Sequence, residues 1–375
     1  MSTVSLKRLG LLFAVALVGA VPAVALLGAA PAAAQQAAGP PRTGQQVYET
    51  ICATCHGPEG RGGVNLELEK VIALPDFSDC SFANREPDSD WLAVAHGGGP
   101  ARGFSPLMAP WGGTFSIEEL SLAVGHLRTF CNDDSWPRGE LNLPLALVTG
   151  KAFPEDEAVV KVTSQDGNVV TRFVYERRFG ALNQWEVALP INSVDNAGGR
   201  STGLGDIALG YKRVLTHSLS RGNIASASAE VRLPSGSQDK GLGSGTAVFE
   251  PFLTFGQIMP RDSFLQVQTG FEIPFESGYN NEAFWRVAVG KSFEQGQFGR
   301  TWSPMFEVLG AKPIVSGADV EWDVVPQMQV TLNARQHIRV NAGARVPVNN
   351  RDHRSTSVIV YLLWDWFDGG FLDGW

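Results

Sequence analysis

From about Gly150 to Trp375, apolar and polar residues alternate along the chain in repeated runs. In one run, Ile207, Leu209 and Tyr211 alternate with small or charged residues. Similar runs cover residues 227–233, 265–273, 321–332, 338–346 and 358–366. A period of two predicts β-strands that have one apolar and one polar face.

The length of the runs separates two all-β architectures. Strands of a soluble β-sandwich usually have about five or six residues, whereas a tilted strand needs about nine to eleven to cross a bilayer. Charges of both signs on the polar face, such as Asp323 and Arg345, suit a water-filled interior. The pattern therefore favours an antiparallel transmembrane β-barrel of about twelve strands over residues 151–375.

Aromatic residues near the predicted strand ends are expected at the lipid headgroups: Trp185, Tyr211, Phe255, Trp285, Trp302 and Trp322. The last run also ends in aromatic residues, and it resembles the closing strand of outer-membrane proteins: Val358, Val360, Leu362, Trp364, Trp366 and the terminal Trp375. The expected location of the chain is therefore the outer membrane.

Residues 41–132 show a different pattern, which predicts helices and loops. A short helix is expected from Gly44 to Thr50. Ser116 and Glu119 form a capping box that predicts a second helix, ending at Cys131. Residues 133–150, with two prolines and several small polar residues, are expected to form a linker.

Residues 1–34 have the pattern of a secretory signal peptide, because Lys7 and Arg8 precede a long apolar stretch that ends in small residues. An uncleaved membrane anchor is the alternative, and both imply export. The formal net charge is −8, and loss of these two cations would make it −10. Such a charge argues against a nucleic-acid partner.

The most specific motif is Cys52-Ala53-Thr54-Cys55-His56. This spacing is typical of covalent c-type haem attachment, in which two thiols form thioethers and the following histidine ligates the iron. A thioredoxin-like motif would need a βαβ context, and a zinc site would need further ligands. The sequence therefore predicts one haem c, bound by Cys52, Cys55 and His56.

A second axial ligand is expected downstream. Met108 lies in a loop bounded by Pro106 and Pro110, and a His/Met pair raises the reduction potential of haem. Met108 could instead fill the core, and His96 and His126 are rival ligands. The remaining cysteines, Cys80 and Cys131, are expected to form a disulfide in an oxidising compartment, although two free thiols are the alternative.

The first half resembles a class I cytochrome c in its short first helix, its attachment motif, its methionine loop and its closing helix. The resemblance implies that the first and last helices cross, with Gly44 and Tyr48 against Leu127 and Phe130. It also implies a proline carbonyl bonded to the proximal histidine, a role for which Pro75 is a candidate.

The second half resembles outer-membrane barrels associated with degradation of aromatic compounds, through glycine-rich stretches at 203–210, 232–236 and 241–245. The joined halves resemble fused cytochrome–porins. This architecture implies one-electron transfer at or across the outer membrane, with a redox protein or another electron donor or acceptor as partner. A small-solute transporter with a periplasmic haem domain is the alternative, and a peroxidase would need an open iron position.

Overall fold

The computed structural model describes residues 42–365. The predicted signal peptide, Trp366 and Trp375 lie outside these residues. The first part of the described chain is helical, and its elements are listed here: α1 (Gly44–Ile51), α2 (Ala53–His56), α3 (Leu66–Glu69), α4 (Cys80–Ala83), α5 (Asp88–Gly97), the 3₁₀ turn Gly99–Arg102, α6 (Ile117–Arg128) and the 3₁₀ turn Gly139–Leu141. Within residues 42–365, no helix is long and apolar enough to cross a membrane.

The predicted capping box at the start of α6 is confirmed. The side chain of Ser116 accepts from the amide of Glu119, whose carboxylate accepts in return from the amide of Ser116. Helix α6 ends at Arg128 and not at Cys131, so the prediction was three residues too long. The α-helical hydrogen-bond pattern ends there, because the amide of Thr129 donates to the carbonyls of His126 and Leu127.

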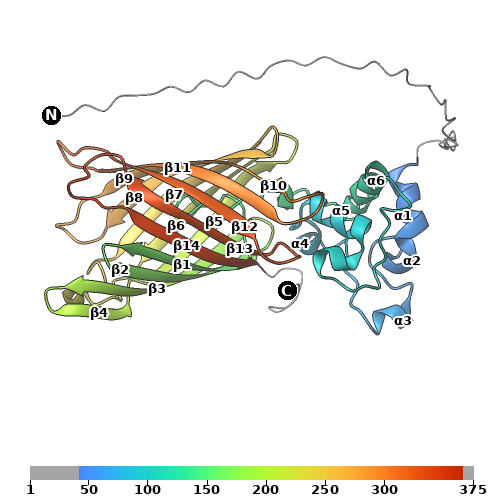
Figure 1. The fold of residues 1–375 in the computed structure, drawn as a ribbon, viewed down its shortest axis with the longest axis horizontal. Helices are drawn as coiled ribbons and strands as arrows, with labels where there is room; N and C mark the ends of the chain where they lie inside the picture. Colours follow the sequence, from blue (N-terminus) through green and yellow to red (C-terminus); the bar gives the residue numbers. More distant parts are fainter. Residues whose placement is uncertain (1–41, 366–375) are drawn as a thin grey trace, which may run out of the picture. The chain divides into compact units, whose positions relative to one another are not determined.

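Helices α1 and α6 cross, as expected (Figure 1). Gly44 permits the close approach, since a Cβ atom there would lie 2.0 Å from the carbonyl oxygen of Leu122. The ring of Tyr48 meets that of Phe130 edge-on at 5.2 Å and also packs with Leu127. The crossing is therefore confirmed, with Leu122 as the nearest neighbour of Gly44.

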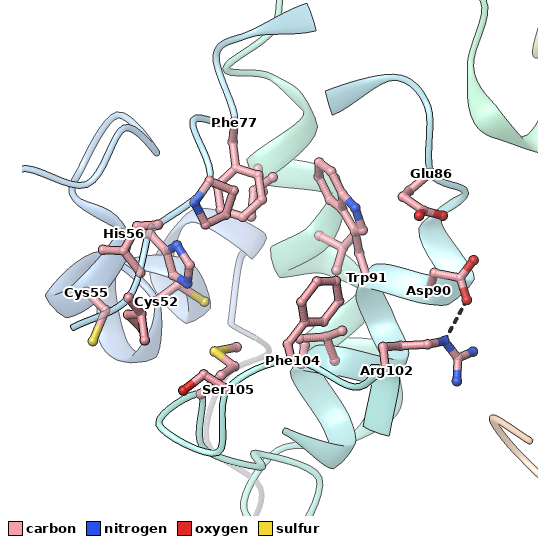
Figure 2. A pocket seen from close by; sticks show the side chains of 18 of the residues that line it. Cys52, Cys55, His56, Phe77, Glu86, Asp90, Trp91, Arg102, Phe104 and Ser105 are labelled. Atoms are coloured by element: carbon pink, nitrogen blue, oxygen red, sulfur yellow. Dashed lines mark hydrogen bonds and ion pairs between the residues drawn. The ribbon is translucent and has the colours of Figure 1, made fainter. Parts of the chain in front are cut away.

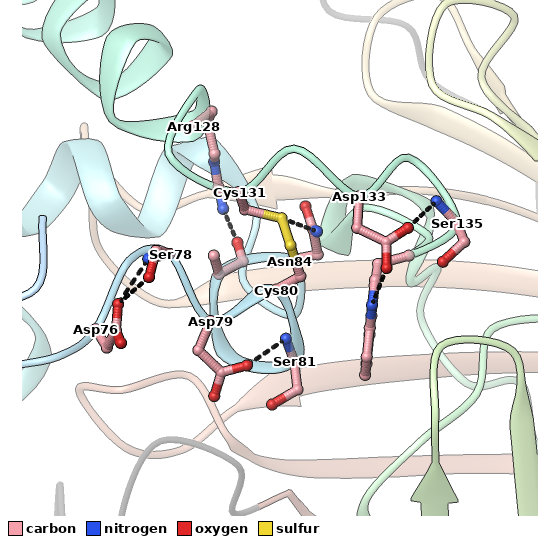
Figure 3. Close-up of a disulfide and its surroundings, with 12 residues drawn as sticks. Asp76, Ser78, Asp79, Cys80, Ser81, Asn84, Arg128, Cys131, Asp133 and Ser135 are labelled. Carbon is pink, nitrogen blue, oxygen red and sulfur yellow. Dashed lines mark hydrogen bonds between the residues drawn. A yellow bond between two sulfur atoms is a disulfide. The ribbon is translucent and has the colours of Figure 1, made fainter. Parts of the chain in front are cut away.

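The predicted disulfide between Cys80 and Cys131 is present, and it ties the start of α4 to the chain after α6 (Figure 3). The two Cα atoms are 5.2 Å apart. The amide group of Asn84 donates to the sulfur of Cys131 at 3.1 Å. The bridge fixes the end of α6, which forms part of the wall of the cavity described below.

Removal of this bridge is expected to destabilise the helical domain. A Cys80→Ala, Cys131→Ala variant should lose about 2–4 kcal/mol of unfolding free energy, because the unfolded chain regains the entropy of a loop with a sequence separation of 51. Chemical denaturation followed by the helical circular dichroism signal measures the change. An unchanged denaturation midpoint would show that the bridge adds no stability.

The second part of the described chain is one antiparallel sheet (Figure 1). Its strands are listed here: β1 (Glu157–Gln165), β2 (Asn168–Phe179), β3 (Asn183–Asn196), β4 (Gly199–Leu204), β5 (Ala208–Ser218), β6 (Asn223–Arg232), β7 (Val248–Met259), β8 (Ser263–Pro274), β9 (Glu282–Lys291), β10 (Phe293–Glu294), β11 (Thr301–Pro313), β12 (Glu321–Thr331), β13 (Ile338–Pro347) and β14 (Ser357–Asp365).

The sheet closes on itself, because β14 pairs with β1 and β9 pairs with β11. Within residues 42–365 the sheet has fourteen strands, of which β4 only extends the hairpin of β3 and β10 only flanks the start of β11. Twelve strands thus form the closed ring. The predicted barrel is confirmed, and the β-sandwich alternative is wrong.

Side chains alternate between the two faces of the wall, as the period of two predicts. Along β14, Val358, Val360 and Leu362 face outward and are exposed, whereas Tyr361 and Leu363 face inward and are buried. Inward positions on the other strands carry many polar groups, including Gln266, Glu307 and Asn341. The wall therefore has an apolar outside and a mainly polar inside.

The two ends of the barrel differ in their connections. We call the end where β1 begins and β14 ends the proximal end, and the opposite end the distal end. Short turns at residues 180–182, 219–222 and 260–262 lie at the proximal end, and longer loops such as 233–247 lie at the distal end. At the distal end Asp206 joins the glycine-rich stretches, since its carboxylate accepts from the amides of Gly236 and Ser244.

The chain between the helices and β1 lies inside the barrel. We call residues 141–155 the inner segment; part of it had been expected to be a linker. Its groups contact inward side chains on strands around the ring: Lys161, Gln184, Lys212, Gln266, Gln268, Glu307, Gln327, Gln329, Asn341 and Tyr361. Lys161 is the middle residue of β1, so the segment reaches halfway along the lumen.

Both polar and apolar contacts hold the inner segment. The carboxylate of Glu307 accepts from the amides of Val148 and Thr149 at 3.1 and 2.6 Å. Leu147 packs with inward residues of the wall, and glycine at position 343 leaves room for its side chain. Leu143 packs against Phe264 and Met305 on other strands. The segment is therefore a fixed part of the barrel core.

Candidate haem site

A cavity of about 580 Å³ lies in the helical domain (Figure 2). Cys52, Cys55, His56 and Met108 all line it, so the structure brings together the four residues that the sequence singled out as ligands. The volume falls in the range of roughly 300–1,000 Å³ that is usual for small-molecule and cofactor sites.

The attachment motif is positioned by the turn between α1 and α2. The amides of Cys55 and His56 both donate to the carbonyl of Cys52, at 3.1 and 2.9 Å, which places the two thiols and the imidazole at one end of the cavity. The hydroxyl of Tyr48 donates to the carbonyl of Gly57 at 2.7 Å and holds the chain directly after the motif. Tyr48 is fully buried, and burial raises the pKa of its hydroxyl, which stays protonated as a donor.

The electrostatics of the motif fit haem attachment better than the alternatives. Burial lowers the pKa of His56 to about 4, so its imidazole is neutral near pH 7, as a metal ligand must be. Burial, and then the charge of Cys55, raise the pKa of Cys52 to about 12. Redox-active Cys-x-x-Cys motifs need a lowered thiol pKa, and the motif lies on helices without a βαβ unit.

The loop that carries Met108 is held by backbone hydrogen bonds. The carbonyl of Met108 accepts from the amide of Gly99 at 2.9 Å, and the amide of Met108 donates to the carbonyl of Ser105 at 3.1 Å. The rival ligands lie elsewhere: His96 packs against Phe298 and His126 lies between Tyr48 and Phe130, and neither lines the cavity. Met108 therefore has the best position of the three for a second axial ligand.

The walls of the cavity are mostly apolar and come from α2, α3, α4, α5, α6 and the loops between them. Phe77 contacts the ring of His56 at 5.1 Å and that of Trp91 at the same distance. Leu120 and Val124 complete the wall from α6. Pro75 lines the cavity, but Nδ1 of His56 has no hydrogen-bond partner among residues 42–365, so the predicted bond to a proline carbonyl is not formed.

Charged residues gather across the cavity from the motif. Figure 2 shows Glu86, Asp90 and Arg102 on the side opposite Cys52 and His56. Arg102 is only 2% exposed, and its Nε donates to Asp90 at 2.7 Å. Its Nη1 donates to the carbonyl of Phe298, in the turn before β11, at 2.7 Å.

Sequence reasoning missed Arg335, which lines the same cavity although it belongs to the turn between β12 and β13. Its guanidinium lies over the ring of Phe104, 4.3 Å from the centroid, and donates to the carbonyl of Gly103 at 3.3 Å. No local pattern marks such a residue, because only the folded chain brings this turn to the helical domain.

The residues present fit a covalently held haem. Buried polar atoms normally have a partner, yet Nδ1 of His56 and Nη2 of Arg102 have none among the described residues. The imidazole of His56 is an iron-ligand type at the thiol end, and the guanidinium of Arg102 is a carboxylate-binding type at the other end. An apolar space between such ends suits a porphyrin with iron at its centre and carboxylates on the edge away from its thioethers.

Comparison with protein families agrees with this geometry for the helical part. Residues 39–127 match the family model described as cytochrome C oxidase, cbb3-type, subunit III. The matched range contains Cys52, Cys55, His56 and Met108. A comparison with curated proteins found no match. The chain thus joins a cytochrome domain to a twelve-stranded barrel.

Among solved structures, the chain is similar to three barrels at low identity. The NanC porin has a TM-score of 0.39 at 9% identity, covering 56% of this chain and 98% of that one. The KdgM porin has a TM-score of 0.39 at 8% identity, and the match covers 56% of this chain and 99% of that one. The COG4313 outer membrane channel from Pseudomonas putida F1 has a TM-score of 0.39 at 11% identity, and the match covers 57% of this chain and 96% of that one. Similarity at this level does not indicate a shared function.

Proposed function

We propose that this chain is a single-haem c-type cytochrome that its own barrel holds in the outer membrane, where it transfers one electron at a time. The observation that carries the proposal is the convergence of Cys52, Cys55, His56 and Met108 on one largely apolar cavity. The cytochrome match over residues 39–127 supports it.

Each ligand has a separate task in this proposal. Cys52 and Cys55 would hold the group through thioethers that prevent its loss, while His56 and Met108 would ligate its iron. The haem supplies an iron that alternates between the ferrous and ferric states. Because His56 and Met108 would both ligate the iron, no position would be open to a substrate, which favours electron transfer over peroxidase chemistry.

The outer surface of the barrel supports a membrane location. Large apolar side chains are exposed on most strands of the ring, as in this list: Val162, Phe173, Leu189, Leu209, Leu253, Phe271, Val289, Phe306, Met328 and Leu362. Soluble proteins rarely expose contiguous apolar surface on this scale. Trp185 and Trp302 lie toward the proximal end, and Trp285 and Trp322 toward the distal end, as aromatic belts would.

The interior of the barrel favours electron transfer over solute transport. The inner segment fills the proximal half of the lumen. Ion pairs lie in the distal half, where Arg172 of β2 contacts Glu230 of β6 at 3.1 Å and Arg345 contacts Asp323 on the neighbouring strand at 2.5 Å. A transporter needs a continuous path, and these groups obstruct it.

A redox titration of the purified full-length chain in detergent tests the proposal. The expected result is one reversible one-electron transition, with haem absorbance recovered after each cycle, in protein recovered from the outer-membrane fraction. Haem that neither reduces nor reoxidises, or a chain found only in the soluble fraction, would contradict the proposal.

Substitution of Met108 tests the second axial position. A Met108→Ala variant is expected to lose the weak far-red sulfur-to-iron band. Its reduction potential should fall on the order of 0.1 V, within the span of about 0.8 V that axial ligands cover. Met328→Ala, on the outer face of β12, is the control and should change neither property. A far-red band that survives in Met108→Ala would remove Met108 from the iron.

A further inference from the structure

The helical domain does not close the charged end of its cavity alone. Two turns at the proximal end of the barrel reach this region. Phe298, before β11, accepts the hydrogen bond from Arg102, and Arg335, before β13, stacks on Phe104 and lines the cavity. In the same turn as Arg335, Nε2 of His337 lies 2.6 Å from the carboxylate of Glu86.

Two acidic and two basic side chains line this end of the cavity. The carboxylate of Asp90 receives Nε of Arg102, and the carboxylate of Glu86 contacts His337. Both protein carboxylates therefore already have basic partners. Arg102 keeps Nη2 buried and without a hydrogen-bond partner among residues 42–365. Arg335 brings a second guanidinium to the same cavity.

We propose that Arg335 of the barrel, together with Arg102, binds the two carboxylates of the haem, so that the barrel is part of the cofactor site. The inference rests on the proposed function, because it requires a haem attached at Cys52 and Cys55. The porphyrin carboxylates lie on the edge away from the thioethers, and Arg102 lies across the cavity from the two thiols. Guanidinium groups bind carboxylates through paired, charge-assisted hydrogen bonds.

This arrangement would let a side chain of the barrel change the reduction potential of the haem iron. A positive charge near the haem disfavours the ferric state, which carries one more positive charge than the ferrous state. Loss of Arg335 also leaves the negative charge of a haem carboxylate less neutralised. Both effects act in the same direction, so removal of the guanidinium should favour the oxidised form and lower the reduction potential.

The test uses the full-length chain with its haem. Arg335→Ala is expected to raise the ratio of oxidised to reduced haem about tenfold at a fixed potential, which corresponds to a fall of about 59 mV for a one-electron couple. Resonance Raman spectra should show a shifted carboxylate bending mode. Arg335→Lys retains the charge and should recover most of the potential. Arg221→Ala, in the turn between β5 and β6, is the matched control and should resemble the wild type.

The outcomes separate this inference from the proposed function. If wild-type protein carries covalent haem and cycles normally, but Arg335→Ala leaves the potential and the carboxylate mode unchanged, the barrel has no part in binding the haem carboxylates. If the wild type carries no covalent haem, the proposed function itself fails. A fall in potential in Arg335→Ala that Arg221→Ala does not show supports the inference.

Discussion

A Cys52→Ala, Cys55→Ala variant is expected to contain no covalently bound haem. Both thiols line the cavity beside His56, and no other thiol does so in the described chain. Without thioethers, only the two axial bonds and apolar packing would retain a haem, which denaturation then releases. Haem staining after denaturing electrophoresis measures the loss.

The remaining pair of cysteines provides a matched control. Cys80→Ala, Cys131→Ala also removes two sulfurs from the same domain, but these form the disulfide and do not line the cavity. This variant should keep its covalent haem while losing stability. Covalent haem that persists in Cys52→Ala, Cys55→Ala would contradict the assigned attachment site.

The wild-type chain is expected to be silent in a planar lipid bilayer, and a chain with a loosened inner segment is expected to conduct. Replacement of residues 143–150 by a Gly-Ser sequence of equal length removes the side chains of Leu143 and Leu147. Burial of these two contributes about 3–6 kcal/mol, at about 1.5–3 kcal/mol each. The flexible replacement should leave its position in the lumen. Stepwise single-channel currents should then appear, because the pore is open.

A Gly-Ser replacement of residues 275–281 is the control, because this loop joins β8 to β9 at the distal end and lies outside the inner segment. It should remain as silent as the wild type. Steady conductance in the wild type would instead favour the solute transporter. If the 143–150 replacement keeps its β-sheet signal and does not conduct, the distal ion pairs must close the lumen by themselves.

Local patterns in the sequence predicted the parts of the fold that depend on local chemistry. Val358, Val360 and Leu362 alternate with inward residues because one face of the wall is exposed and the other is buried. The capping box at Ser116 predicted the start of α6, since a cap depends on residues only three positions apart. The spacing of Cys52 and Cys55 indicated their chemistry for the same reason.

Features that depend on distant parts of the chain could not be read in this way. The inner segment resembles a linker because it is short and contains Pro144, and its partners, such as Glu307 and Tyr361, lie far downstream. Arg335 resembles any charged turn residue until the fold brings it to Phe104. In both cases the stabilising contact joins residues that are far apart in the sequence, so no local pattern predicts it.

The intact mass of the purified, denatured chain tests the central claim most directly. The account predicts that the mass exceeds that of the polypeptide by one haem, and that the increment disappears when Cys52 and Cys55 are both replaced. A polypeptide of unmodified mass, from cells that attach haem to other c-type cytochromes, would contradict it.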